Sequence, residues 1–343
     1  MNPLDLFITL GSDEATRQGV GPLVARERRR RGMDVPAELE AQERQIAATE
    51  ILRERALDAL FARFESERLP LLVFKGTALA YTLYEHPALR PRCDTDVVVR
   101  DADVSRARAI LQQCGYAEEP SSGAVVSNAQ RIFSRVDGFG VRHAIDLHWR
   151  TLNRPRLARS FEFEELWSRA ISFRSLQSVR TPSTEDALLL AAAHLAGHHP
   201  GESRLIWLYD LHLLAAVADL PEVIRRARGK GIAREIAAAL TSAACIDDRI
   251  PIGRQSRLRE FVEDLRYTKG ALRKLRFLRD HLLPDADHVL RKYGATSRAL
   301  LPFLYLRRLL GLFGRSPLLS GSTQHPVVPD EKSKPAVRQG RKA

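Results

Sequence analysis

The segment Asp94-Thr95-Asp96, which runs directly into Val97-Val98-Val99, constrains this chain more than any other. β-Branched residues favour a strand, and alternate side chains of a strand share one face of the sheet. The carboxylates of Asp94 and Asp96 are therefore expected to point the same way, from Cα atoms about 7 Å apart. Two neighbouring carboxylates at the start of a strand form the oxygen-rich kind of site that hard cations such as Mg²⁺ prefer.

Two further segments predict strands. Leu71–Phe74 is a short apolar run that stops at Lys75-Gly76, which is typical of a buried strand turning into a helix. Ile145-Asp146-Leu147-His148 predicts a strand with Asp146 and His148 on one face and the two apolar side chains on the other. A third carboxylate on a separate strand completes the kind of acidic set that phosphoryl transfer with two metal ions uses.

Together these residues resemble the polymerase-β-like nucleotidyltransferase superfamily, and within it a bacterial branch of uncharacterised nucleotidyltransferases. The resemblance rests on Lys75-Gly76 in the turn, Asp94-x-Asp96 on the next strand and Asp146-Leu147-His148-Trp149 on the third, and it extends over about Leu39 to Leu214. It implies an α+β fold, in which a mixed sheet with helices is followed by a mostly helical C-terminal part. The superfamily commonly has Gly-Gly or Gly-Ser in the turn, whereas this chain has Lys-Gly followed by Thr77.

The resemblance also implies roles for individual residues. Asp94, Asp96 and Asp146 are expected to be the catalytic carboxylates and the ligands of Mg²⁺ or Mn²⁺, with Asp146 as the base. The nucleotide-binding residues are expected in the turn and ahead of the acidic strand: Lys75, Gly76, Thr77 and Arg92. A glycine lets a ligand approach the backbone closely, and the N-terminus of the following helix favours phosphate. A surface position for Arg92 is an equal alternative, and His148 is expected either to orient Asp146 or to fill core space.

The implied function is transfer of a nucleoside monophosphate from an NTP, with ATP favoured, to an acceptor hydroxyl that the sequence does not identify. Such an enzyme is a metal-dependent nucleotidyltransferase of the EC 2.7.7 type. Two other readings stay open: a non-catalytic nucleotide-binding or regulatory protein that retains the fold, and a basic RNA-binding protein. The formal net charge of +12 favours anionic partners, so nucleic acid is a possible partner that the transfer reaction does not require.

Four segments follow from composition and motif placement in a chain of 343 residues, which is long enough for two domains or one elaborated domain. We expect an N-terminal basic segment at 1–35, a nucleotidyltransferase core at 36–150, a helical domain at 151–313 and a disordered basic tail at 314–343. The arginine cluster Arg26–Arg31 is interpreted as a solvated helix face in preference to a nucleic-acid site.

Helical periodicity predicts a long helix from near Pro36 to about Glu67, and further helices over 206–217, 221–244, 256–283 and 300–313. An additional helix, with its start at 182–186 and its body at 187–198, contains His194 and His198, four residues apart, with His199 next to them. The chain lacks the glutamate that would make these residues an H-E-x-x-H motif. A structural role, or a polar contact to the substrate cleft, is therefore favoured over metal binding for these histidines.

Cysteine content and apolar run length bear on the location of the protein. Cys93, Cys114 and Cys245 are widely spaced and form neither a zinc pattern nor a disulfide framework. The first ten residues lack the basic start and apolar core of a signal peptide. No uncharged apolar run approaches the roughly 20 residues that a membrane span needs. A reducing cytoplasm is the expected location, without a membrane span.

Overall fold

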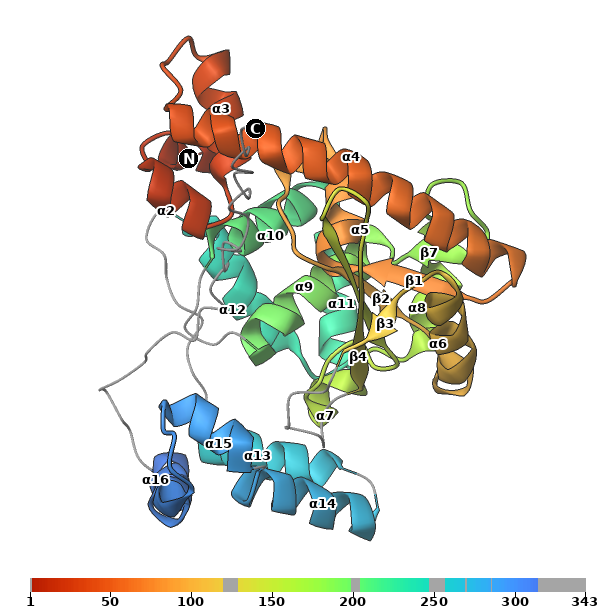
Figure 1. Ribbon diagram of the computed structural model, residues 1–343, viewed down its shortest axis with the longest axis vertical. Coiled ribbons are helices and arrows are strands. Elements are labelled where there is room, and N and C mark those ends of the chain that lie inside the picture. Colours follow the sequence, from red (N-terminus) through yellow and green to blue (C-terminus); the bar gives the residue numbers. More distant parts are fainter. Residues whose placement is uncertain are drawn as a thin grey trace, which may run out of the picture. The chain divides into compact units, whose positions relative to one another are not determined.

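The structure, a computed structural model, describes residues 2–119, 129–198, 204–246, 257–268, 270–284 and 286–313 (Figure 1). The chain forms two compact units, Met1–Asp285 and Ala286–Ala343. The expected disordered tail, 314–343, and His199 lie outside the described residues. The larger unit contains Lys75-Gly76, Asp94-x-Asp96 and Asp146–Trp149, so it is the unit that bears on function.

Seven strands of the described residues form one mixed sheet in the order β3-β4-β5-β2-β1-β7-β6. β1 pairs antiparallel with β2 and parallel with β7, whereas β2 pairs parallel with β5. The expected mixed sheet and α+β fold class are thereby confirmed. The strands are β1 (Leu71–Phe74), β2 (Thr95–Val98), β3 (Ala117–Glu118), β4 (Gln130–Val136), β5 (Arg142–His148), β6 (Ile171–Ser172) and β7 (Val179–Thr181).

Alternation along the central strands sends apolar side chains into two separate cores. Leu71 and Val73 join one core, which α4 (Ala37–Ser66) and α6 (Val104–Gln113) close. Leu72 and Phe74 join the other core, together with α9 (Thr184–His198), α10 (Leu205–Val217) and α12 (Ala233–Ala244). Because the sheet is buried on both faces, any polar side chain of a central strand must find partners or a cavity.

The sheet also draws on residues beyond 150, a part of the chain that the sequence indicated to be mostly helical. Val179 in β7 pairs with Leu71 and is fully buried in the core beneath α4, so tertiary contacts decide its conformation. Helices expected to be continuous are divided at glycines with positive φ, a conformation that interrupts a helix. Gly231 separates α11 (Leu220–Gly229) from α12, and Gly270 separates α13 (Arg257–Tyr267) from α14 (Ala271–Leu282).

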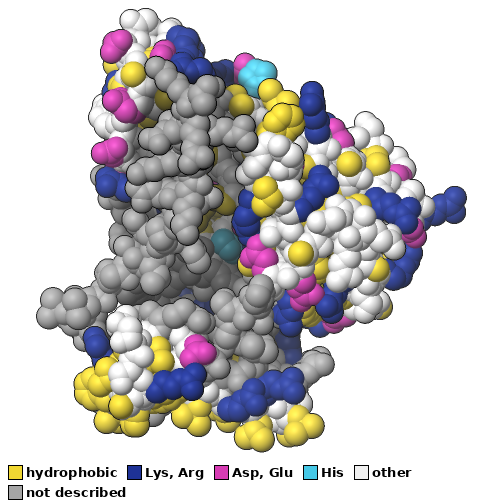
Figure 2. All heavy atoms as spheres, viewed as in Figure 1, with side chains coloured by type: hydrophobic (Ala, Val, Ile, Leu, Met, Phe, Trp, Pro, Cys, Tyr) yellow, Lys and Arg dark blue, Asp and Glu magenta, His cyan; other side chains and the backbone are white. Residues whose placement is uncertain are grey.

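Three short helices, α1 (Pro3–Phe7), α2 (Ser12–Arg17) and α3 (Gly21–Arg30), occupy most of the segment expected to be a basic extension. They are packed into the core of α9 and α10, where the ring of Phe7 lies 5.3 Å from that of Tyr209, centroid to centroid. The arginines at the end of α3 are largely paired with acids, as Glu27 shows by accepting from both Arg30 and Arg31 at 2.6 Å. Figure 2 shows basic side chains at several places on one face of the molecule, with acidic ones between them.

The remaining elements of the larger unit are short. They are α5 (Lys75–Thr82), η1 (Pro87–Leu89), η2 (Asp101–Asp103), α7 (Pro155–Ala158) and α8 (Phe163–Arg169). The smaller unit contains α15 (Ala286–Tyr293), η4 (Arg298–Leu300) and α16 (Leu301–Phe313), with a core of Val289, Leu290 and Leu304. Within the described parts of both units, no helix combines the length and apolar character required to cross a membrane.

The N-terminal helices should contribute directly to stability, and Phe7→Ala tests this. Phe7 is fully buried, so its truncation leaves a cavity and should lower the free energy of unfolding by about 3–5 kcal/mol. Ile51→Ala on α4 is the control, because Ile51 is 55% exposed and should change stability by less than about 1 kcal/mol. Urea unfolding measures both. If Phe7→Ala lowered the free energy of unfolding as little as Ile51→Ala does, α1 would not stabilise the core.

Candidate functional site

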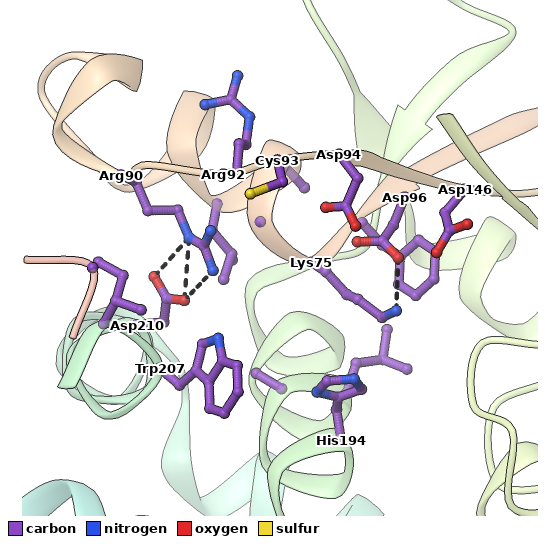
Figure 3. A pocket seen from close by; sticks show the side chains of 18 of the residues that line it. Lys75, Arg90, Arg92, Cys93, Asp94, Asp96, Asp146, His194, Trp207 and Asp210 are labelled. Atoms are coloured by element: carbon purple, nitrogen blue, oxygen red, sulfur yellow. Dashed lines mark hydrogen bonds and ion pairs between the residues drawn. The ribbon is translucent and has the colours of Figure 1, made fainter. Parts of the chain in front are cut away.

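Three carboxylates lie together at one end of the central strands (Figure 3). β2 and β5 pair in a register that places Asp96 opposite Asp146. Asp94 precedes Asp96 by two residues, and its carboxylate lies beside those of the other two (Figure 3). Their apolar neighbours Val97 and Ile145 point into the core beneath α4, so the carboxylates face the side of the sheet that α9 and α10 cover. The structure thus brings together the three acids that the sequence selected.

Lys75 connects β1 to these carboxylates. β1 ends at Phe74, which pairs with Asp96, and Lys75 follows with φ +52°, in the left-handed region. For a residue other than glycine this conformation costs about 1–3 kcal/mol. The strained backbone aims the side chain at the carboxylates, where Nζ donates to Asp96 Oδ1 at 2.7 Å. The charge-assisted bond offsets part of the strain.

His148 contacts the same oxygen from the adjacent strand. Its Nε2 lies 3.0 Å from Asp96 Oδ1 and 3.8 Å from Asp146 Oδ2. An ionised carboxylate can only accept, so Nε2 carries the proton of the bond to Asp96. Burial and the nearby Lys75 charge lower the pKa of His148, which favours the neutral ring. His148 therefore orients Asp96 and also lies next to Asp146. The sequence suggested only the contact with Asp146.

The three carboxyl groups have different proton affinities. Burial acts to raise the pKa of Asp96, but the Lys75 charge and the bonds from His148 and Lys75 outweigh it and hold the pKa well below its ordinary value. Desolvation, followed by repulsion from Asp96, raises the pKa of Asp94 to about 6, although its side chain is open to water in the cavity. Desolvation and repulsion from the other two acids raise the pKa of Asp146 to about 7. Asp96 is thus the permanent anion of the group, and Asp146 is a proton acceptor near neutral pH.

Gly76 lets a buried guanidinium approach the first turn of α5. A Cβ at this position would lie only 2.6 Å from Arg90 Nη1. Arg90 is in turn held by Asp210 of α10, whose Oδ2 accepts from Nη2 at 2.7 Å, while Tyr84 donates to Oδ1 at 2.7 Å. Glycine was expected here because a ligand approaches the backbone, and the close neighbour that the structure shows is Arg90.

Arg92 and Thr77 are engaged in an internal network behind the carboxylates. Arg92 donates to Glu50 of α4 at 2.5 Å and to Thr77 Oγ1 at 3.1 Å, and its side chain is 2% exposed. The Thr77 hydroxyl lies 3.0 Å from Thr95 Oγ1. Figure 3 shows the Arg92 guanidinium directed away from the acids. These bonds fix the segment that leads into Asp94. A direct contact of either side chain with a nucleotide stays a prediction.

The carboxylates open into a cavity of about 720 Å³. The wall opposite the sheet comes from α9 and α10 and includes His194 and Trp207, both turned toward the cavity in Figure 3. Gly19 and Gln42, from the N-terminal part of the chain, complete the lining. Of the histidines in 194–199, the structure thus places His194 at the cavity, in agreement with the polar contact to a cleft favoured from the sequence.

The acidic group fits a divalent cation. Asp96, Asp146 and His148 each offer a ligand atom, and these atoms lie within 4.8 Å of one another. Asp146 Oδ1 is buried and has no hydrogen-bond partner among the described residues, which leaves it available to a cation. The carboxylate oxygens of Asp96 and Asp146 are ligands that suit Mg²⁺ and Mn²⁺. Asp94, on the cavity side of Asp96, could supply a further oxygen.

Sequence reasoning missed the residues that reach the site from far along the chain. Glu50 and Asp210 are both buried acids in otherwise ordinary helices, and each holds an arginine of the segment before Asp94. A buried acid needs a cationic partner, so an aspartate inside the apolar run of α10 was the available signal. The sequence contains many arginines, and only the fold shows that Arg90 is the partner of Asp210.

A protein-family model described as "Uncharacterised nucleotidyltransferase" matches residues 12–246. No curated protein matches the chain. Among solved structures, the antibiotic-resistance factor ANT(2'')-Ia aligns at 14% identity with a TM-score of 0.37, over 57% of this chain and 94% of that one. JHP933 from Helicobacter pylori aligns at 11% identity with a TM-score of 0.26, over 58% of this chain and 94% of that one.

The raised pKa of Asp146 predicts how stability without metal depends on pH. The folded chain holds a proton at this carboxyl up to about pH 7, whereas the ordinary value is 3.8. Between these values the unfolded state binds fewer protons, so stability falls as the pH rises. Asp146→Asn removes this contribution, and the variant should lose less stability than the wild type between about pH 5 and pH 8.

Urea unfolding with a chelator present, at both pH values, measures the difference. Asp58→Asn on α4, at a carboxylate that is 53% exposed, is the control and should follow the wild type. An unchanged pH dependence in Asp146→Asn would contradict the electrostatic description of the site.

Proposed function

The chain belongs to the family of uncharacterised nucleotidyltransferases, and from this premise we propose that it transfers a nucleoside monophosphate from an NTP such as ATP to an acceptor hydroxyl. The observation that supports the proposal is the set of three carboxylates, Asp94, Asp96 and Asp146, at one end of adjacent strands and open to a large cavity. The reaction depends on a divalent cation, Mg²⁺ or Mn²⁺, bound by these residues.

In the proposed reaction the acceptor oxygen forms a bond to the α-phosphorus of the NTP, and the bond from that phosphorus to the bridging oxygen breaks. Pyrophosphate leaves with the electron pair. Asp146 takes the proton of the acceptor hydroxyl, a role that suits a carboxylate that lies beside Asp96 and whose second oxygen has no hydrogen-bond partner among the described residues. Divalent ions in such sites activate the hydroxyl and stabilise the charge on the leaving pyrophosphate.

Phosphate binding is assigned to the start of α5. Lys75 supplies an ammonium next to the carboxylates, and the backbone N–H groups of Gly76 and Thr77 belong to the first turn of the helix, where anions are favoured. Arg90 lies against Gly76, but its charge is already paired with Asp210, so it acts as a positioning residue. Arg92 acts through its bonds to Thr77 and Glu50, and it is a positioning residue in this proposal.

The non-catalytic alternative is kept because of one observation. Asp96 Oδ1 already accepts from Lys75 and is bonded to His148, an arrangement that gives the anion a partner without any metal. In a nucleotide-binding protein that does not catalyse transfer, these two contacts would be enough to stabilise Asp96 without a metal ion. For the RNA-binding alternative, the pairing of Arg29, Arg30 and Arg31 with acids reduces the positive charge available to a backbone of phosphates.

Asp94→Asn is the direct test of the catalytic site. Asp94 is preferred over Asp96 as the target because replacing Asp96 would also leave Lys75 without its anion. Pyrophosphate release from ATP, GTP, CTP and UTP is measured with Mg²⁺ or Mn²⁺ and a cell extract as the source of acceptor. The variant should release pyrophosphate at least about 100-fold more slowly, because it loses a charged ligand at the reacting phosphate.

The same variant should also lose most of the rise in melting temperature that Mn²⁺ gives the wild type. Asp58→Asn should match the wild type in both measurements. Retained Mn²⁺ stabilisation and nucleotide binding without pyrophosphate release from the wild type, with any of the four NTPs, would favour the non-catalytic alternative.

A further inference from the structure

The cavity has a second end, which is built by the start of α10 and the N-terminal helices. Arg204 immediately precedes α10, and the next two residues donate backbone N–H groups to Gln18: Leu205 to Oε1 at 3.0 Å and Ile206 to the carbonyl at 3.2 Å. The following residue, Gly19, packs tightly, because a Cβ there would lie 3.1 Å from Arg204 Nη2. The start of α10 is therefore fixed by contacts between distant parts of the chain, and the exposed Arg204 side chain lies against Gly19.

Arg204 brings a positive charge to this end, and no carboxylate of the described residues forms an ion pair with it. Partial desolvation lowers the pKa of Arg204, as expected of a cation without a nearby anion. Asp210, the acid on the same helix that lines the cavity, is already bonded to Arg90 and Tyr84. It therefore offers little negative charge to a ligand.

A flat apolar surface adjoins the cation. The guanidinium of Arg204 lies 5.3 Å from the centroid of the Trp207 ring, and Trp207 lines the cavity together with Ile206 and Leu190. Arginine binds carboxylate and phosphate groups through two parallel hydrogen bonds, and an indole face accepts planar or apolar groups. The two ends of the cavity thus differ in chemistry, with three carboxylates at the sheet and a guanidinium beside an indole at α10.

Resting on the nucleotidyl transfer proposed above, we infer that the Arg204 end binds the acceptor, and that the acceptor carries a carboxylate or phosphate group on a planar or apolar body. The NTP phosphates are placed at the acidic end, where Lys75, the start of α5 and the metal ligands lie. An acceptor bound between the two ends would present its hydroxyl to Asp146 while its anionic group meets Arg204. A polycationic acceptor would meet an unneutralised guanidinium and is disfavoured.

Three naphthalene compounds of similar shape and different charge test the inference on the full chain: 2-naphthoate, neutral 2-naphthamide and cationic 2-naphthylmethylammonium. Ligand-observed NMR titrations give their dissociation constants. The wild type should bind the carboxylate about tenfold more tightly than the amide, as expected for a charge-assisted bond, and the ammonium compound most weakly.

Arg204→Gln should reduce naphthoate affinity to that of the amide and leave amide binding unchanged. Arg204→Lys keeps the charge but not the two-pronged geometry and should retain part of the preference, which also guards against a folding defect in the first variant. Arg44→Gln removes a cation that is 72% exposed on α4 and should behave as the wild type.

Several outcomes would overturn the inference. If the wild type bound 2-naphthoate and 2-naphthamide equally well, the inference that the acceptor carries an anionic group would be wrong. If the preference for naphthoate over the amide required Mg²⁺ and persisted in Arg204→Gln, the carboxylate would bind at the metal site and not at Arg204. Displacement of naphthoate by a non-hydrolysable ATP analogue would show that this end holds the nucleotide. Because these titrations need no transfer, they can succeed or fail independently of pyrophosphate release, which tests the proposed function itself.

Discussion

Repulsion among three carboxylates is the constraint around which the rest of this site is organised. The strand register sets Asp96 opposite Asp146, with Asp94 close by, in a protein interior where like charges interact strongly. The structure moderates this in two ways. Lys75 and His148 neutralise and orient Asp96, while Asp94 and Asp146 remain protonated to higher pH than an ordinary carboxyl. The group is therefore poised to gain free energy when a cation binds.

Buried ion pairs hold the segment that carries the acids. Arg90 is bonded to Asp210 of α10, and Arg92 is bonded to Glu50 of α4, so the segment before Asp94 is tied to helices on both faces of the sheet. Removing charges from water is costly, and such pairs add little net stability. Their value is geometric, because a guanidinium fixes direction through several bonds at once. A displacement of either helix would be transmitted to the carboxylates.

The N-terminal helices are part of the larger unit and of its core. Phe7 packs against Tyr209 on α10, and Gln18 caps the start of that helix, next to Arg204. This arrangement builds the wall of the cavity opposite the sheet from residues nearly 190 positions apart in the chain. It also explains the pairing of the α3 arginines with acids, since these side chains stabilise a folded element of the unit.

The sequence by itself determined the central strands and the acids on them. Three local patterns predict these strands: the apolar run Leu71–Phe74 followed by a turn, the β-branched run Val97–Val99 after Asp94-Thr95-Asp96, and the polar–apolar alternation at Ile145–His148. The strands β1, β2 and β5 and the face occupied by Asp146 and His148 follow from these patterns. The resemblance to nucleotidyltransferases used the same local residues, which is why it agreed with the family match.

Only the tertiary structure decided which residues complete the site. The partners of Arg90 and Arg92 lie 120 and 42 residues away, and many acids of this chain would have served equally well on sequence grounds. β7 is too short to be recognised by periodicity and exists because Val179 fills a core position beside β1. The end of the cavity formed by Arg204 and Trp207 likewise depends on how α10 meets the N-terminal helices. Several residues of the same type are equally suitable on local grounds, and long-range packing decides which of them reaches the site. No single segment of the sequence contains that information.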